Sequence, residues 1–191
     1  MNFVKEYKLA FDFLKKSKEF IYLVIGLFLF FGLVGFFVPV PEVIRVQIIE
    51  MIKNLLAQTE GLNAFELVKF IFLNNFSSSF FSIFFGVFFG ILPFFSIIFN
   101  GYILGFVCSL SVREAGIFSL WKLFPHGIFE IPAIFISFAL GIKFGTFLFW
   151  RKKKDSFSKL FWEIVRVFIL IVIPLLIVAA VIEGNLVFLF S

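Results

Sequence analysis

The acidic side chain of Glu130 lies in a long apolar part of the sequence, four residues after the chain's only histidine, His126. In a helix this spacing places both side chains on one face. Ionisable groups are costly in apolar surroundings unless they are paired or hydrated, so this pair is a candidate for chemistry. One interpretation is a pair that handles protons or coordinates a ligand. The structural interpretation, which we expect, is that Glu130 bonds a neighbouring helix, with Asn75 or Asn100 as donor.

The sequence lacks the parts of the common catalytic and metal sites. One histidine cannot form a His-Glu-x-x-His zinc site, and the single cysteine, Cys108, excludes an intrachain disulfide and a cysteine-based zinc cluster. There is no Gly-x-Ser-x-Gly elbow and no phosphate-binding loop. The run from Ser77 to Ser79 has no base nearby in the sequence, although folding could bring His126 close to it. We therefore predict no catalytic residue, no metal site and no cofactor.

Small and polar residues recur at helical spacing in three apolar segments. The stripes are Asn75, Ser79, Ser82, Gly86 and Gly90; Gly101, Gly105, Cys108 and Ser109; and His126, Glu130, Ala133, Ser137, Gly141 and Gly145. Because lipid gives helices no hydrophobic reason to associate, small residues mark faces where backbones approach closely. We predict that the six glycines pack helices together, with the three stripes facing one another. We also predict a buried polar cluster of Asn75, Asn100, His126 and Glu130.

An offset of 55 residues superimposes the first of these stripes on the third, placing Asn75 on Glu130, Gly86 on Gly141 and Gly90 on Gly145. This pattern is what a weak duplication with parallel helices would produce. Lys143 lies about 140° around the helix from Glu130, so it cannot be its direct partner. We expect the Lys143 side chain to extend toward the lipid headgroups instead.

The composition identifies lipid as the solvent around these residues. Of 191 residues, 62% are hydrophobic and 15% are charged, and 36 are phenylalanine. Soluble domains are about 45–50% apolar. The 17 basic and 12 acidic residues give a net charge of +5, which we interpret as an orientation signal rather than as nucleic-acid binding. The expected partners are the bilayer and a membrane protein or a second copy of the chain.

Uncharged runs define the elements that must position these residues, since about 20 apolar residues cross a bilayer. We predict an all-α, polytopic membrane protein forming one domain over residues 1–191. Its transmembrane helices should span 20–40, 65–92, 94–112, 125–150 and 167–182, with a kink at Pro174. Amphipathic helices at 1–19 and 42–60 should lie on the membrane surface. A signal peptide is the competing interpretation of 20–40, but Pro39 and Pro41 end that run and no small-residue cleavage site follows.

The distribution of basic residues predicts the orientation. With a cytoplasmic N-terminus, eleven lysines and arginines outside the membrane fall on the cytoplasmic side, including the run from Arg151 to Lys154, and four fall outside. This bias matches the positive-inside rule. Segment 1–19 should therefore be cytoplasmic and segment 42–60 external, in the cytoplasmic (inner) membrane of the cell.

A set of motifs in the central half of the chain resembles the stage II sporulation protein M family of integral membrane proteins. The motifs are Asn74-Asn75, Gly86-x-x-x-Gly90-x-x-Pro93, Asn100-Gly101-x-x-x-Gly105, Pro125-His126-Gly127-x-x-Glu130-x-Pro132-Ala133 and Gly141. The resemblance covers about Asn74 to Gly145. It implies a scaffold role. In spore-forming bacteria such a scaffold is a membrane partner of cell-wall-degrading enzymes during engulfment. The signature positions that the resemblance implies are Asn75, Asn100, His126, Gly127 and Glu130.

The leading functional hypothesis is therefore a non-enzymatic membrane scaffold or assembly partner. Two alternatives remain. A small transporter or channel with a polar cavity centred on Glu130 would require a water-filled path to the inner side. An intramembrane hydrolase using His126 and Glu130 would require a nucleophile or metal ligand within reach of His126.

Overall fold

The computed structural model describes residues 3–147 and 154–190, without the side chains of residues 121–126, 128, 154–156 and 190. Within these ranges every regular element is a helix. Five helical segments are long and apolar enough to span a membrane. They are α2 (Lys18–Phe37), α4 (Ala64–Gly86), α5 (Ile91–Ala115), α6 (Phe124–Thr146), and the continuous helix that ends in α8 (Ile173–Phe190). The predicted all-α membrane fold with five spanning helices is confirmed.

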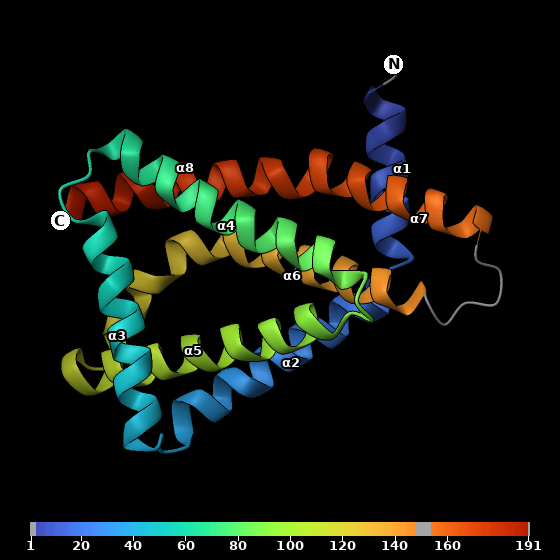
Figure 1. Ribbon diagram of the computed structural model, residues 1–191. Helices are drawn as coiled ribbons and strands as arrows, with labels where there is room; N and C mark the ends of the chain where they lie inside the picture. The colour runs from blue at the N-terminus through green and yellow to red at the C-terminus, as the bar shows by residue number, and fades with distance from the viewer. Residues whose placement is uncertain (1–2, 148–153, 191) are drawn as a thin grey trace.

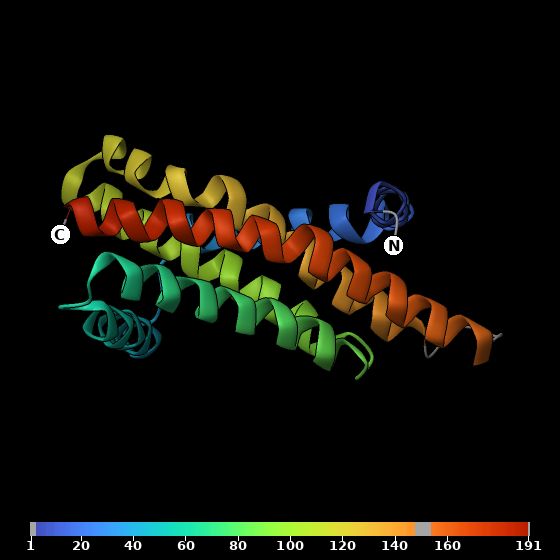
Figure 2. The same cartoon turned by 90° about the horizontal axis from the view of Figure 1, so that it is seen from above.

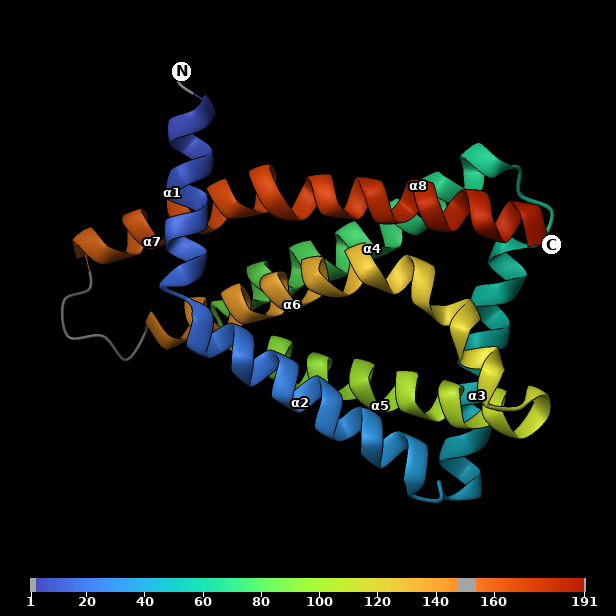
Figure 3. The same cartoon turned by 180° about the vertical axis from the view of Figure 1, so that it is seen from behind.

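The spanning helices form two groups that diverge. One group is α2 with α5, and the other is α4 with α6 and α8. Figures 1 and 3 show the groups converging at the end where α1 (Phe3–Lys15) lies and separating toward the end where α3 (Glu42–Thr59) lies. We call these the narrow end and the wide end. At the narrow end Val24 of α2, Ile97 of α5 and Phe138 of α6 share one hydrophobic cluster, which joins the two groups.

Helices α1 and α3 run across the bundle at its two ends. Figure 1 shows both roughly perpendicular to the spanning helices, and the view from above in Figure 2 shows both nearly end-on. This is the orientation of helices that lie on a membrane surface. Ile48 is the one buried residue of α3, so this helix keeps nearly all of its surface exposed.

Glycines bring helices of each group into backbone contact. Gly86 of α4 packs on Gly141 of α6, and Gly145 packs on Gly90 at the end of the same pair. Because residue numbers rise together along both helices, α4 and α6 are parallel. The glycine pairs at an offset of 55 residues are thus direct contacts across one interface.

The third glycine stripe has a different partner from the one predicted. Gly101 and Gly105 of α5 pack against Phe28 and Gly32 of α2, again in parallel. The expectation that all three stripes face one another was therefore wrong for α5. A small-residue stripe identifies a face for close approach, but it does not identify which helix will occupy that face.

Local signals explain where the helices begin and turn. Asn63 caps α4: its Oδ1 accepts from the backbone N–H of Glu66, and its own N–H donates to the Glu66 carboxylate at 2.9 Å. The turn between α4 and α5 places Phe89 and Gly90 at positive φ, 58° and 68°. Such a conformation suits Gly90 but is uncommon for a bulky residue such as Phe89. The 3₁₀ segment η1 (Ile117–Leu123) connects α5 to α6 at the wide end.

The last spanning helix is longer than predicted. Amphipathic α7 (Lys154–Val167) continues through a π-helical turn at Phe168–Val172 into α8, which ends at Phe190 rather than at 182. The π turn directly precedes Pro174, whose ring cannot accommodate the carbonyl one turn earlier, so the helix widens there. Helix α6 ends at Thr146. Of the predicted basic run from Arg151 to Lys154, the first three residues lie outside the described residues, and Lys154 begins α7.

Candidate functional site

Two carboxylic side chains meet inside the membrane-spanning part of the molecule. The carboxyl of Glu130 in α6 lies within hydrogen-bond reach of the carboxyl of Glu183 in α8. Both side chains are partly buried. The Oε2 atom of Glu183 is fully shielded and has no hydrogen-bond partner among the described residues. An ionised carboxylate only accepts hydrogen bonds, so a bond between these two groups requires a proton on one of them.

Glu183 is the partner that the sequence analysis missed. It follows the predicted end of the fifth helix by one residue, so the prediction placed it outside the membrane-spanning part. The signal was nevertheless present, because Glu183 is the only charged residue between Val167 and the C-terminus. An isolated acidic residue in such a run is a candidate for an interhelical bond by the same argument that selected Glu130.

Asn75 lies at the same level as Glu130 along the α4–α6 pair. Each residue precedes by eleven positions a glycine of the contacting pair Gly86 and Gly141, and the helices are parallel. Asn75 is buried, and its Oδ1 accepts from the amide of Asn74 at 3.4 Å. The structure thus places two of the four predicted cluster residues at one level of one interface.

The other two predicted cluster residues are not placed with them. Asn100 lies on the exposed surface of α5, and its amide donates to the carbonyl of Ser96 in the same helix at 2.8 Å. Asn100 belongs to the α2–α5 group, which diverges from α6 toward the wide end. The backbone of His126 lies in α6, but its side chain is outside the described residues.

Buried hydroxyl groups continue from Asn75 toward the narrow end. Ser79 and Ser82 of α4 are buried, and their Oγ atoms have no partner among the described residues. Ser137 of α6 is also buried and donates to the carbonyl of Ala133 at 2.8 Å. Small side chains at these positions let the two backbones approach, and the glycines beyond them close the interface. A methyl group on Gly86 would lie 2.7 Å from the Cα of Gly141.

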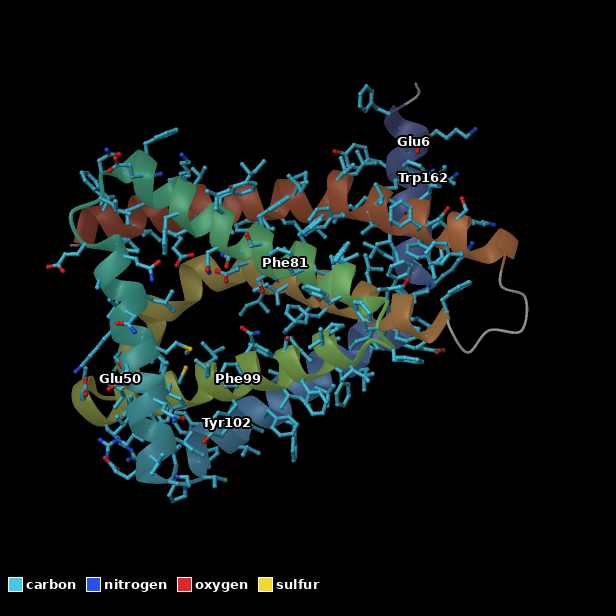
Figure 4. All side chains as sticks on the ribbon, in the orientation of Figure 1. Glu6, Glu50, Phe81, Phe99, Tyr102 and Trp162 are labelled. Carbon is cyan, nitrogen blue, oxygen red and sulfur yellow. The ribbon has the colours of Figure 1, made fainter. Side chains whose placement is uncertain are left out.

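Lys143 occupies a second buried polar site, at the corner between α1 and α2. It is 7% exposed, so the predicted extension toward the headgroups was wrong. Its Nζ donates to the hydroxyl of Ser17 at 2.7 Å and lies 4.2 Å from the centre of the Phe13 ring. The nearby crossing of α1 and α7, where Figure 4 labels Glu6 and Trp162, is held by an ion pair of 2.6 Å between Glu6 and Arg166.

Comparison with known proteins identifies the family. The family model for stage II sporulation protein M matches residues 24–187, from the first spanning helix to the last. The chain belongs to the stage II sporulation protein M family. No curated protein and no solved structure matches the chain. For this family member the match covers both glycine-packed pairs and both carboxylates.

Two further observations concern possible binding sites in the described part of this stage II sporulation protein M family member. No group of three or more His, Cys, Asp or Glu side chains gathers among the described residues as a metal site would require. One surface groove of about 540 Å³ lies between α2 and α5 and is lined mainly by apolar side chains, including Phe31, Phe99 and Tyr102. Neither Glu130 nor Glu183 lines it. The chemistry available at the carboxyl pair is hydrogen bonding between helices and the holding of a proton.

Proposed function

We propose that this chain is a non-enzymatic scaffold that assembles other proteins at the membrane. The observation that carries the proposal is the packing at the narrow end, where Gly86, Gly90, Gly141 and Gly145 bring α4 and α6 into backbone contact. A path for a solute that ran along the α4–α6 interface toward the narrow end would have to pass through this contact. Close backbone packing of this kind favours a rigid body over a conduit.

The exposure of α3 supports the same proposal. This helix lies across the wide end, and Ile48 alone among its residues is buried. Its side chains Gln47, Glu50, Asn54 and Gln58 border an open groove of about 420 Å³ on the helix surface. A helix that presents polar side chains outside the bundle is suited to bind a protein domain beside the membrane.

The orientation belongs to the proposal as well. We infer that the narrow end, with α1 and α7, faces the cytoplasm of a cell whose inner membrane holds the protein, and that α3 lies outside. The positive-inside bias of eleven basic residues to four supports this orientation.

A transporter is the second candidate, because the pairing of Glu130 with Glu183 adds a second carboxyl to the predicted centre. Such pairs occur where protons or cations pass through membranes. The hydrolase alternative gains no support from a metal site, since no group of three or more His, Cys, Asp or Glu side chains gathers among the described residues.

Reconstitution separates the two candidates. Wild-type protein and the Glu130→Gln variant are placed in liposomes containing a pH-sensitive dye, and proton and sodium gradients are imposed. The scaffold proposal expects fluxes equal to those of protein-free vesicles for both proteins. A flux that the wild type supports and Glu130→Gln abolishes would establish transport instead.

A second experiment tests assembly directly. A photo-crosslinking amino acid is placed in native membranes at Asn54, which is exposed on α3 and borders its groove, and at Leu33, which is 59% exposed on α2. We expect position 54 to yield a defined protein adduct and the Leu33 control to yield mainly lipid. The absence of a protein adduct at position 54 and at the other groove positions of α3 would contradict a docking role for this helix.

A further inference from the structure

Polar side chains are exposed on two of the spanning helices, one from each group. They are Asn74 and Ser78 of α4 and Asn100 of α5, and all three are exposed. We call them the polar face. Figure 4 labels Phe81 on α4 and Phe99 on α5, the two helices that carry the polar face.

The packing determines which way the polar face points. Asn100 follows Pro93 by seven residues, which places it on the same side of α5. A methyl group on Gly141 of α6 would contact the Pro93 ring at 3.2 Å, so this side of α5 is the one that turns toward α6. The groups separate beyond Pro93, and Asn100 is left uncovered.

The corresponding argument holds for α4. Phe76 and Phe80 contact the ring of Phe168 in the last spanning helix. Asn74 and Ser78 lie on the opposite side of α4 at 100° per residue. The α4 part of the polar face therefore points away from α8.

Lipid cannot satisfy these amides. Among the described residues, each Asn side chain bonds only within its own helix, Asn100 to Ser96 and Asn74 to Asn75. Each side-chain amide offers two donors and an acceptor with two lone pairs, so most of this capacity remains available. Polar groups exposed to hydrocarbon are unfavourable, and bonds to another helix remove the penalty.

We propose that the polar face is the interface between two copies of this chain. The amide group of asparagine is self-complementary, and the polar face carries no charge that a second copy would repel. A two-fold axis along the membrane normal keeps each residue at its depth. Along the helix axes, Asn74 lies about 18 Å and Asn100 about 14 Å from the α4–α5 turn. Their depths therefore differ by less than one helical turn, so the amides of one copy can meet those of the other.

This inference does not depend on the scaffold role, because the dimer forms from purified protein alone. The mass of the wild type is measured in nanodiscs large enough for two copies and across a dilution series in detergent. We expect a dimer. The double variant Asn74→Leu with Asn100→Leu should raise the dimer dissociation constant about tenfold or more. Its thermal unfolding temperature should not fall, because leucine suits lipid.

The matched control changes two exposed apolar side chains on other surfaces, Phe30→Leu in α2 and Ile169→Leu in the π turn. It should dimerise like the wild type. A wild type that is monomeric throughout overturns the proposal, and so does a dimer that the double variant leaves unchanged.

Disulfide trapping locates the interface. In a Cys108→Ser background, Asn100→Cys should form an oxidised dimer readily, whereas Tyr102→Cys, which borders the groove with α2, should not. Trapping at Tyr102 but not at Asn100 overturns the assignment. A purified protein that is monomeric but cross-links through position 100 to a different protein in cell membranes also overturns it and assigns the face to a foreign helix.

Discussion

At the scale of single residues, the structure depends on buried polar groups that find partners in distant parts of the chain. Glu130 and Glu183 join α6 to α8, and Lys143 and Ser17 join α6 to the corner between α1 and α2. In each pair at least one residue could be selected from the sequence, since it interrupts an apolar run. The pairing itself could not, because the sequence does not state which helices will be adjacent.

Substitution of Glu130 tests its structural role. Glu130→Gln retains an acceptor and supplies donors that can bond the Glu183 carboxylate, so we expect thermal stability in detergent near that of the wild type. Glu130→Leu leaves the Glu183 carboxyl without this partner, and we expect a loss of about 1–3 kcal/mol. Equal damage from both substitutions would contradict an interhelical bond. A stable Glu130→Gln protein that assembles but lacks function would overturn the scaffold proposal.

The Lys143 site has a natural matched control. Ser17 and Ser137 are both fully buried, and each hydroxyl donates to the carbonyl four residues earlier at 2.8 Å. Only Ser17 is shown to accept also from the Lys143 ammonium. We therefore expect Ser17→Ala to destabilise the protein by about 1.5–3 kcal/mol, the range for bonds to charged groups, and Ser137→Ala to have a clearly smaller effect. Thermal unfolding of both variants measures the difference, and equal losses would show that the ammonium bond contributes little.

At the scale of helices, most of the fold could be predicted, including the packing of α4 on α6, whereas the partner of α5 could not. Uncharged runs identified the five spanning segments, because the side chains of a spanning helix are surrounded by hydrocarbon, where charged groups are unfavourable. The extension of α8 past residue 182 was missed because Glu183 resembled a terminus. The partner of α5 was missed because Gly32 and Gly35 of α2 lie in a uniformly apolar run with no polar residue to mark the stripe.

Glycine substitutions test the helix contacts. Gly86→Ala places a methyl group against the backbone of Gly141, whereas Gly26 of α2 has no atom within 4 Å of the corresponding position. We expect Gly86→Ala to destabilise the protein by about 1–3 kcal/mol, as overpacking does. The control Gly26→Ala should be neutral or slightly stabilising, because alanine favours helix. Measured by thermal unfolding, similar effects at the two positions would show that the α4–α6 contact is looser than described.

At the scale of the whole molecule, five crossings place the two ends of the chain on opposite sides of the membrane. The positive-inside bias then predicts that a topology reporter fused after Lys153 is active in the cytoplasm and that one inserted at Asn54 in α3 is active outside. Alkaline phosphatase and green fluorescent protein fusions provide the readout. Both positions reporting the same side would contradict the five-crossing arrangement.

The position of α3 has a mechanical consequence. Helices α4 and α5 contain 23 and 25 residues, so each is about 35 Å long, and they are joined at one end by the short turn through Phe89 and Gly90. Because the helices are this long, a rotation of α4 relative to α5 by about 5° at the turn displaces their far ends by about 3 Å. Helix α3 connects the far end of α2 to that of α4, and its 18 residues give it a length of about 27 Å. Because α3 links the two groups of helices at the wide end, its length limits how far they can separate.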